Sequence, residues 1–313
     1  MSWCLLILES KSIFPAPSLN QLSDSNQSPS SKSLLGYAQV LKIVREFFLA
    51  RTVLEVVTPS IGKYPCGDTN THSLQLINGQ FLRTSPEHEM KKLIVSCGQD
   101  IYQLGVVFRD EPVLSDLHMQ DFIMCEWYRL GYTTDRLIKE VVDLLKQVTF
   151  LWPPEELSFY QLLQRSFGVW LEDASPETLM NLARELGLVD AKGARPEQVL
   201  DFLYASATRQ LPQESITVVR YFPESLANQS CVLPHAPHLC DRFELFIGRV
   251  EIANGARELR DAALYTERLK KYNPSVAIDA ELVALMPRLP DMSGVALGIS
   301  RLQYLYNIKN TTL

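Results

Sequence analysis

The segment 108–128 holds the residues best suited to chemistry. Arg109 follows one apolar run, and Phe122, Glu126 and Tyr128 occur at every second or fourth position of the next. Alternate side chains of a strand share a face, so these three residues are expected to lie together. A guanidinium binds phosphate bidentately, and an apolar ring can stack on a purine. The pattern therefore indicates a site for the phosphate and the purine ring of a nucleotide. The alternative is a solvent-exposed hairpin with a surface ion pair between Arg109 and Glu111.

A second cluster contains Glu251 and Glu258, which are seven residues apart. In a regular strand this odd spacing places them on opposite faces, but a bulge at Asn254-Gly255 would bring them to one face. Two carboxylates near a triphosphate would suit Mg²⁺, which takes few carboxylates together with substrate oxygens. The alternative is a pair of exposed strand glutamates.

A third candidate lies at 294–301, where an apolar strand ends at Gly298 and Arg301 falls in the first turn of a helix. Glycine permits close approach of a ligand to the backbone. Arg301 would then reach over the same site.

Four possible metal ligands gather in ten residues: Cys231, His235, His238 and Cys240. Zinc accepts two thiolates and two imidazoles, but this spacing fits no finger, so a proline-rich surface loop is favoured. The six cysteines form no C-x-x-C pair, and the N-terminus shows no secretion signal. We therefore expect a reduced, cytoplasmic protein.

The periodicity of apolar residues predicts the elements that position these clusters. Strands are expected at 53–57, 74–77, 81–84, 101–108, 121–129, 216–222, 242–247, 250–253 and 295–299. Helices are expected at 34–50, 86–96, 135–148, 262–272 and 279–287, with a mostly helical stretch at 155–210 and a short terminal helix. Hairpin-paired strands with helices gathered between them predict an α+β fold, in which helices flank an antiparallel sheet.

Three local signals fix boundaries near the first cluster. Asn78-Gly79 is a strong hairpin signal. Ser85-Pro86-Glu87 reads as an N-cap, a first-turn proline and a first-turn acid, and Gly98 ends the helix that they begin.

Composition limits the class of protein. The 313 residues are 46% hydrophobic and 21% charged with a net charge of −6, which suits a globular chain and offers no basic footprint for nucleic acid. Residues 1–33 are serine-rich and predicted to be a disordered leader, and 34–313 to be the folded domain with an insertion at 155–210. No apolar run is long enough to cross a membrane.

The motifs resemble class II aminoacyl-tRNA synthetases. Phe108-Arg109-x-Glu111 with His118 and Phe122 resembles their motif 2, Gly298-x-x-Arg301 resembles motif 3, and 53–59 resembles the end of motif 1. The lysyl branch is indicated by Thr84-Ser85-Pro86-Glu87, Glu126-Trp127-Tyr128 and Glu251-x-x-Asn254-Gly255-x-x-Glu258. The resemblance covers about 34–305 and implies the catalytic-domain fold of that class and a homodimer.

Only about 33 serine-rich residues precede the motif 1 helix, too few for an anticodon-binding barrel. Two motifs, Glu126-Trp127-Tyr128-Arg129 and Asp291-x-Ser293-Gly294-Val295-Ala296-Leu297-Gly298, are similar to those of the freestanding elongation factor P–(R)-β-lysine ligase family. That family activates a lysine-type amino acid with ATP and transfers it to a lysine side chain of elongation factor P. The resemblance implies ATP as substrate, Mg²⁺, elongation factor P as partner, and no membrane or tRNA.

The resemblance also implies roles for individual residues. Arg109 and Arg301 would be catalytic, by neutralising charge. ATP would be bound by Arg109, Asp110, Glu111, His118, Met119, Phe122, Glu251, Ile252, Gly298 and Arg301. The amino acid would be bound by Ser85, Pro86, Glu87, Glu126, Tyr128 and Glu258, and the metal by Glu251 and Glu258.

Two alternatives remain open from the sequence. One is a lysyl-type tRNA ligase without its anticodon domain. The other is a weakly active or non-catalytic paralogue, because Ser300 and Met119 stand where the family usually has Asp and Asn.

Overall fold

The structure is a computed structural model. It describes residues 31–67, 71–110, 119–148, 152–188, 193–227, 229–274, 276–303 and 306. The predicted leader at 1–33 therefore lies almost wholly outside the described residues.

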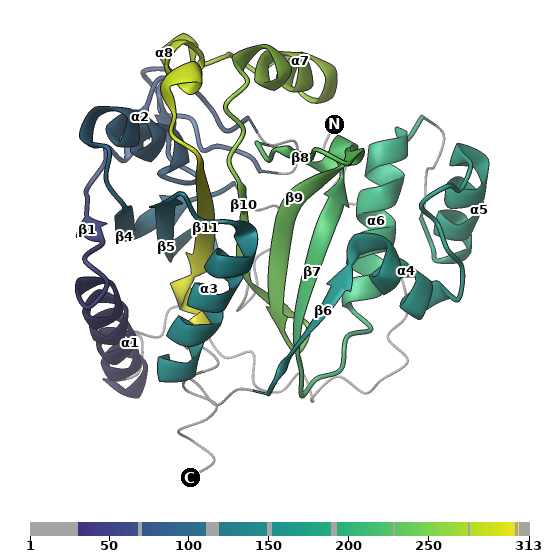
Figure 1. The fold of residues 1–313 in the computed structure, drawn as a ribbon, viewed down its shortest axis with the longest axis horizontal. Coiled ribbons are helices and arrows are strands. Elements are labelled where there is room, and N and C mark those ends of the chain that lie inside the picture. The colour runs from purple at the N-terminus through teal and green to yellow at the C-terminus, as the bar shows by residue number, and fades with distance from the viewer. Residues whose placement is uncertain are drawn as a thin grey trace.

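A nine-stranded mixed sheet forms the centre of the molecule (Figure 1). Its order is β1 (Leu54–Glu55), β4 (Ile101–Phe108), β5 (Asp121–Leu130), β11 (Met292–Gly298), β10 (Val250–Arg257), β9 (Ala236–Ile247), β7 (Ile216–Pro223) and β6 (Pro154–Ser158), with β8 (Val232–Leu233) beside β9. The interior pairs are antiparallel, whereas β1–β4 and β6–β7 at the edges are parallel. The predicted α+β fold is confirmed.

One face of the sheet packs against α1 (Ser31–Leu49) and α3 (Thr134–Val148). The apolar spacing that predicted both helices places Phe48 and Leu144 in the core with Trp127 of β5. Phe48 stacks on Tyr102 with ring centroids 4.4 Å apart. The largest apolar cluster thus packs α1 and α3 against one face of β5 and β11.

Three helices lie at one end of these strands: α2 (Glu87–Cys97), α7 (Ala262–Tyr272) and α8 (Ala280–Leu285) (Figure 1). They share a second apolar cluster with Ile101 and Tyr128. Short 3₁₀ turns follow β7 at Glu224–Leu226 and α8 at Met286–Arg288. Gly98 ends α2 in the left-handed region, with φ of 60°, as its sequence predicted.

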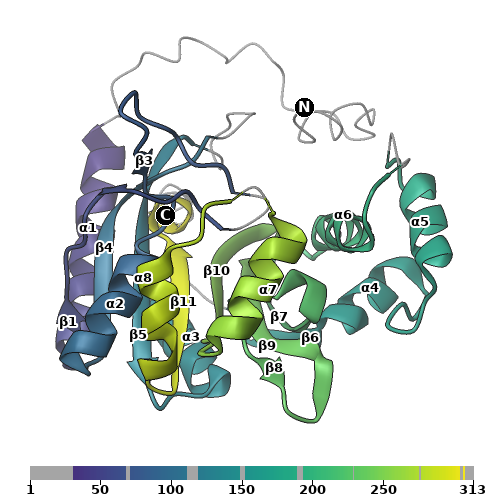
Figure 2. The same cartoon turned by 90° about the horizontal axis from the view of Figure 1, so that it is seen from above.

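The predicted mostly helical stretch contains α4 (Phe159–Phe167), α5 (Pro176–Glu185) and α6 (Pro196–Thr208). In both orthogonal views these helices gather at the end of the molecule opposite α1 (Figures 1 and 2). They have their own apolar cluster, in which Phe159 stacks on Tyr204 at 5.1 Å. The stretch begins with a strand, β6, which the sequence analysis missed because its exposed Glu155 and Glu156 hide any alternation of apolar residues.

The hairpin predicted at 74–84 is shorter than expected. Gly79 has φ of 83°, and the Leu76 N–H donates to the Gln80 carbonyl at 2.7 Å. However, only one bridge, Gln75 to Phe81, joins the two sides, and β3 (Phe81–Leu82) pairs instead with β2 (Ile61–Gly62). Within the described ranges, no helix is both long and apolar enough to span a membrane.

Candidate active site

The strands β5, β11 and β10 turn a polar face away from α3. Their register places Glu126 beside Ala296 and Tyr128 beside Gly294. Directly paired residues of antiparallel strands lie on the same face, whereas the intervening Trp127 is buried in the core. The uninterrupted β5 thus places alternate polar residues on one face, as its sequence predicted.

A bulge in β10 brings the two glutamates of the second cluster to this face. The register shifts between Glu251 and Ala253, so Ile252 is the extra residue. One extra residue converts the odd spacing between Glu251 and Glu258 into an even one. The predicted bulge position at 254–255 was wrong, because those residues pair regularly while Ile252 and Ala253 both enter the core.

Glu126 is the centre of a buried polar group. It is 3% exposed and accepts hydrogen bonds from Ser85 Oγ at 2.7 Å and from the Tyr128 hydroxyl at 2.6 Å. Ser85 Oγ in turn accepts the Glu87 backbone N–H at 3.0 Å, although α2 begins one residue later than predicted, with Pro86 at the cap position. These bonds tie the start of α2 to β5.

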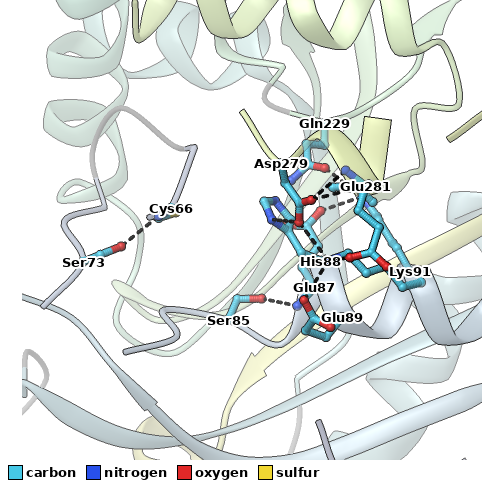
Figure 3. A network of polar contacts seen from close by, with 12 residues as sticks. Cys66, Ser73, Ser85, Glu87, His88, Glu89, Lys91, Gln229, Asp279 and Glu281 are labelled. Carbon is cyan, nitrogen blue, oxygen red and sulfur yellow. Dashed lines mark hydrogen bonds and ion pairs between the residues drawn. The ribbon is translucent and has the colours of Figure 1, made fainter. Parts of the chain in front are cut away.

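Lys91 of α2 joins this group and was not predicted. Its Nζ lies 2.6 Å from Glu87 Oε1 and 2.6 Å from Glu258 Oε2, and it donates to Gln229 Oε1 at 3.1 Å. Lys91 is completely buried. Figure 3 shows Lys91 with Glu87 and Gln229. We call Glu87, Glu126 and Glu258 the carboxylate cluster, and the cluster with Lys91 the amine end of the site.

Burial shapes the charge of the amine end. It raises the pKa of Glu126 and of Glu258 to about 7, and the nearby Glu87 adds to both shifts. Burial also opposes ionisation of Glu87, but Lys91 outweighs it and holds the pKa of Glu87 below its ordinary value. Glu258 and Glu87 likewise raise the pKa of Lys91 despite its burial. Fully ionised, the cluster carries more negative than positive charge, which suits a cationic ligand.

Gly294 lets the amine end close around β11. A Cβ at this position would lie 2.4 Å from Tyr128 Cε1 and 2.6 Å from Glu258 Oε1. Real Cβ atoms do not approach other atoms so closely, so any other residue would push the phenol or the carboxylate away.

Arg109 and Phe122 form one part of a second group at the other end of β5. The Arg109 guanidinium carbon lies 5.1 Å from the centroid of the Phe122 ring. Its Nε is buried and has no hydrogen-bond partner among the described residues. The backbone N–H of Arg109 donates to the Gln120 carbonyl at 2.8 Å, which fixes the turn out of β4.

Arg301 and Glu251 form the other part. Arg301 Nη1 donates to the Glu251 carbonyl at 2.9 Å and to its Oε2 at 3.4 Å. A helix begins at Ile299, directly after Gly298 ends β11. A Cβ on Gly298 would meet Arg301 at an ordinary 3.6 Å, so protein packing does not itself require glycine there. We call Arg109, Phe122, Glu251 and Arg301 the nucleotide end.

The other residues predicted to bind ATP differ in their exposure, and two of them are not described. Asp110 is exposed and Met119 half-buried, while Glu111 and His118 lie outside the described residues. Ser300, which replaces the family's usual Asp, accepts the Ile123 backbone N–H at 3.1 Å. It thereby ties the final helix to β5 by a neutral bond.

The possible zinc ligands do not converge. His238 contacts Glu172 at 3.0 Å, and buried Cys240 accepts from Arg268 at 3.8 Å. The segment forms β8 and the start of β9, so the predicted proline-rich loop was wrong: backbone pairing organises it. No three His, Cys, Asp or Glu side chains of the described chain form a group that could hold a metal.

The structure gives different partners to the two predicted magnesium ligands. Glu251 bonds to Arg301, and Glu258 is an ion-pair partner of Lys91. The contact with a buried ammonium places Glu258 at the amine end.

Sequence reasoning missed Lys91 and Gln229, and it included Gly294 in the third candidate without foreseeing its contacts with Tyr128 and Glu258. The spacing of Glu87 and Lys91, four residues apart in a helix, was a usable signal for an ion pair. Gln229 and Gly294 gave no comparable signal, because their contacts join distant parts of the chain.

Comparison with known proteins gives one family and several close relatives. Residues 20–311 match the family described as tRNA synthetases class II (D, K and N). A protein of Photorhabdus laumondii named elongation factor P–(R)-β-lysine ligase is 34% identical over an alignment of 301 positions, which covers 89% of this chain and 92% of that protein. Proteins of the same name from Haemophilus influenzae and Proteus mirabilis are 34% and 32% identical over 87% and 91% of this chain, and 90% and 94% of their own lengths.

Proposed function

Because the chain belongs to the class II tRNA synthetases (D, K and N), we propose that it is an ATP-dependent ligase that joins lysine or (R)-β-lysine to a lysine side chain of elongation factor P. Relatives that carry the name of this ligase align with about nine-tenths of the chain. The observation that carries the proposal is the buried carboxylate cluster on the same sheet face as two arginines.

ATP is proposed to bind at the nucleotide end. Phe122 would stack on adenine, and Arg109 and Arg301 would contact the phosphates, where their charges offset that of the triphosphate. Asp110, Glu111, His118, Met119, Ile252 and Gly298 complete the proposed ATP set. ATP would bind as its magnesium complex, and Glu251 fits as a single carboxylate ligand because Mg²⁺ keeps most of its other positions for phosphate and water.

The amino acid is proposed to bind at the amine end. Its ammonium groups would contact the carboxylate cluster and the Tyr128 hydroxyl, beside Ser85 and Pro86. Its carboxylate would then point along β5 towards the α-phosphate of ATP.

The proposed reaction has two steps. The substrate carboxylate attacks the α-phosphorus, the bond to the β-phosphate oxygen breaks, and pyrophosphate leaves. The neutral amine of the target lysine then attacks the acyl carbon, AMP leaves, and the amine proton passes to solvent. No side chain forms a covalent intermediate; the protein contributes placement and charge neutralisation.

Pyrophosphate exchange and acyl transfer test the proposal together. We expect exchange that depends on a lysine isomer, and ATP-dependent transfer of that isomer to elongation factor P. Charging of lysine tRNA in place of elongation factor P would favour the tRNA ligase. Absence of both exchange and nucleotide binding would favour a non-catalytic paralogue.

Three further features belong to the proposal. A homodimer would cover exposed Leu49, Leu54 and Val57 at α1 and β1. A cytoplasmic location is also proposed, because the buried thiols of Cys125 and Cys240 are reduced. The domain would span 34–313, with a serine-rich leader before it and the helical insertion at 155–210.

A further inference from the structure

We infer that Lys91 is a positioning residue of the amino-acid site, whose ammonium holds Glu87 and Glu258 in place and sets how much cationic charge the site accepts. The inference rests on the proposed function and adds a residue to it. Lys91 lies within ion-pair distance of both carboxylates, and each belongs to a different part of the chain.

The contacts of Lys91 exclude a direct chemical role. An ammonium has three N–H donors, and the acceptors are Glu87, Glu258 and Gln229 at 2.6, 2.6 and 3.1 Å. Its raised pKa keeps the proton on Nζ. Lys91 therefore has no lone pair for nucleophilic attack and no free N–H for a phosphate.

The same contacts leave oxygens for a ligand. Lys91 engages Oε1 of Glu87 and Oε2 of Glu258. Within the described ranges, the other oxygen of each carboxylate has no hydrogen-bond partner, and Glu258 Oε1 faces Gly294 beside Tyr128. Lys91 thus holds one side of each carboxylate while the other side stays available.

The charge count suits one class of ligand. Above about pH 7, where Glu126 and Glu258 as well as Glu87 are ionised, the three carboxylates exceed the single ammonium by two charges. The acyl group of a lysine or β-lysine adenylate has two ammonium groups. It has no carboxylate charge, because its carboxylate is joined to phosphate. With Lys91 in place, such an acyl group would neutralise the amine end.

Other titratable groups lie near the carboxylate cluster, and among the described residues Arg83 adds a positive charge that acts on it. On α2, burial lowers the pKa of His88 and favours its neutral form, and Lys92 pairs with Asp279 at 2.9 Å. Arg83 acts on Glu126 from a distance while donating to the Thr58 and Val106 carbonyls. Burial raises the pKa of the Cys231 thiol, which is therefore neutral and donates to the backbone carbonyl of Glu258 at 3.0 Å.

Lys91→Met tests the inference against Lys92→Met, a matched change on the same helix. We expect Lys91→Met to raise the KM for (R)-β-lysine about tenfold or more and leave the KM for ATP unchanged. The acid limb of the pH profile should move up by about one unit, because Glu258 loses the cation that lowers its pKa. Lys92→Met should change neither. A wild-type KM and acid limb in Lys91→Met would overturn the inference.

Loss of a buried charge can prevent folding, so Lys91→Arg is the second variant. Its planar fork keeps the charge but changes the geometry, so the KM for (R)-β-lysine should rise while the acid limb stays in place. A wild-type KM in Lys91→Arg would contradict the positioning role.

Calorimetric binding of (R)-β-lysine separates this inference from the proposed function. If wild-type protein binds the amino acid but catalyses no exchange, the proposed ligase fails, and weaker binding by Lys91→Met still supports the inference. If wild-type protein is active and Lys91→Met binds equally well, only the inference fails. No binding by wild-type protein overturns both.

Discussion

The amine end and the nucleotide end occupy the same sheet face but are built differently. At the amine end, buried carboxylates are already held by Lys91, Ser85 and Tyr128. At the nucleotide end, Arg301 has only Glu251 as partner, and Arg109 Nε has none among the described residues. One end is largely preorganised by internal bonds, whereas the arginines of the other have few bonds to the described residues and could contact the proposed phosphates.

This difference suggests that the amine end determines substrate specificity and that the nucleotide end determines the rate of reaction. In the proposed function, the fixed carboxylates would select the substrate amine before reaction, because reorganising a buried ionic network is costly. Arginines with few partners can respond to charge that develops on phosphate. Substitutions at the two ends should therefore change different kinetic constants.

Arg109→Ala should give the largest effect. We expect pyrophosphate exchange to fall about 10³-fold, because a cation over the reacting phosphate is lost. Thermal stability should change little, since Arg109 Nε makes no hydrogen bond to the described residues. Arg257→Ala is the control: that arginine pairs with Asp291 at the surface, and exchange should stay within about twofold. Equal losses in both variants would contradict the contrast between the ends.

Gly294→Ala should break the amine end selectively. The added Cβ must displace Tyr128 or Glu258, so we expect kcat/KM for the lysine isomer to fall about 10²-fold, with a stability loss of about 1–3 kcal/mol. The KM for ATP should hold. Gly62→Ala, whose Cβ meets only an oxygen at 4.0 Å, should leave activity unchanged. A rise in the KM for ATP alone would count against this placement of Gly294.

The pH dependence should reveal the amine end without mutation. The pKa values of Glu126 and Glu258 are raised to about 7. Below pH 7 these carboxylates take up protons and lose attraction for ammonium, so kcat/KM for the lysine isomer should fall about tenfold per unit.

Linkage gives a second test of the same groups. The folded protein holds protons up to about pH 7 that the unfolded chain releases at lower pH, so these groups reduce stability as pH rises to 7. Bound lysine stabilises the folded protein through its ammonium groups, which need ionised carboxylates. The rise in Tm caused by bound lysine should therefore be larger at pH 8 than at pH 6. A larger rise at pH 6 would contradict the assignment.

Ser300→Ala should have the smallest effect. It removes one hydrogen bond to Ile123, which is worth about 1 kcal/mol of stability, and exchange should fall less than about threefold. A loss as large as that of Arg109→Ala would show that Ser300 acts on the nucleotide directly.

The sequence predicted the parts of this arrangement that depend on local pattern. Period-two alternation placed Glu126 and Tyr128 on one face, and apolar spacing placed α1 and α3. It missed β6, which has no apolar alternation, and it placed the β10 bulge at 254–255 because glycine is a local signal. The role of Lys91 was not predicted, because it depends on an ion pair with Glu258, which is far along the chain.

The carboxylate cluster is proposed to select an amino acid by its two amines. The most direct measurement compares pyrophosphate exchange supported by (R)-β-lysine with exchange supported by 6-aminohexanoate and 3-aminohexanoate, which each lack one amine. We predict that either analogue lowers kcat/KM by about 10²-fold or more, because a buried carboxylate is left unpaired. Equal exchange with all three compounds would contradict selection by the carboxylate cluster.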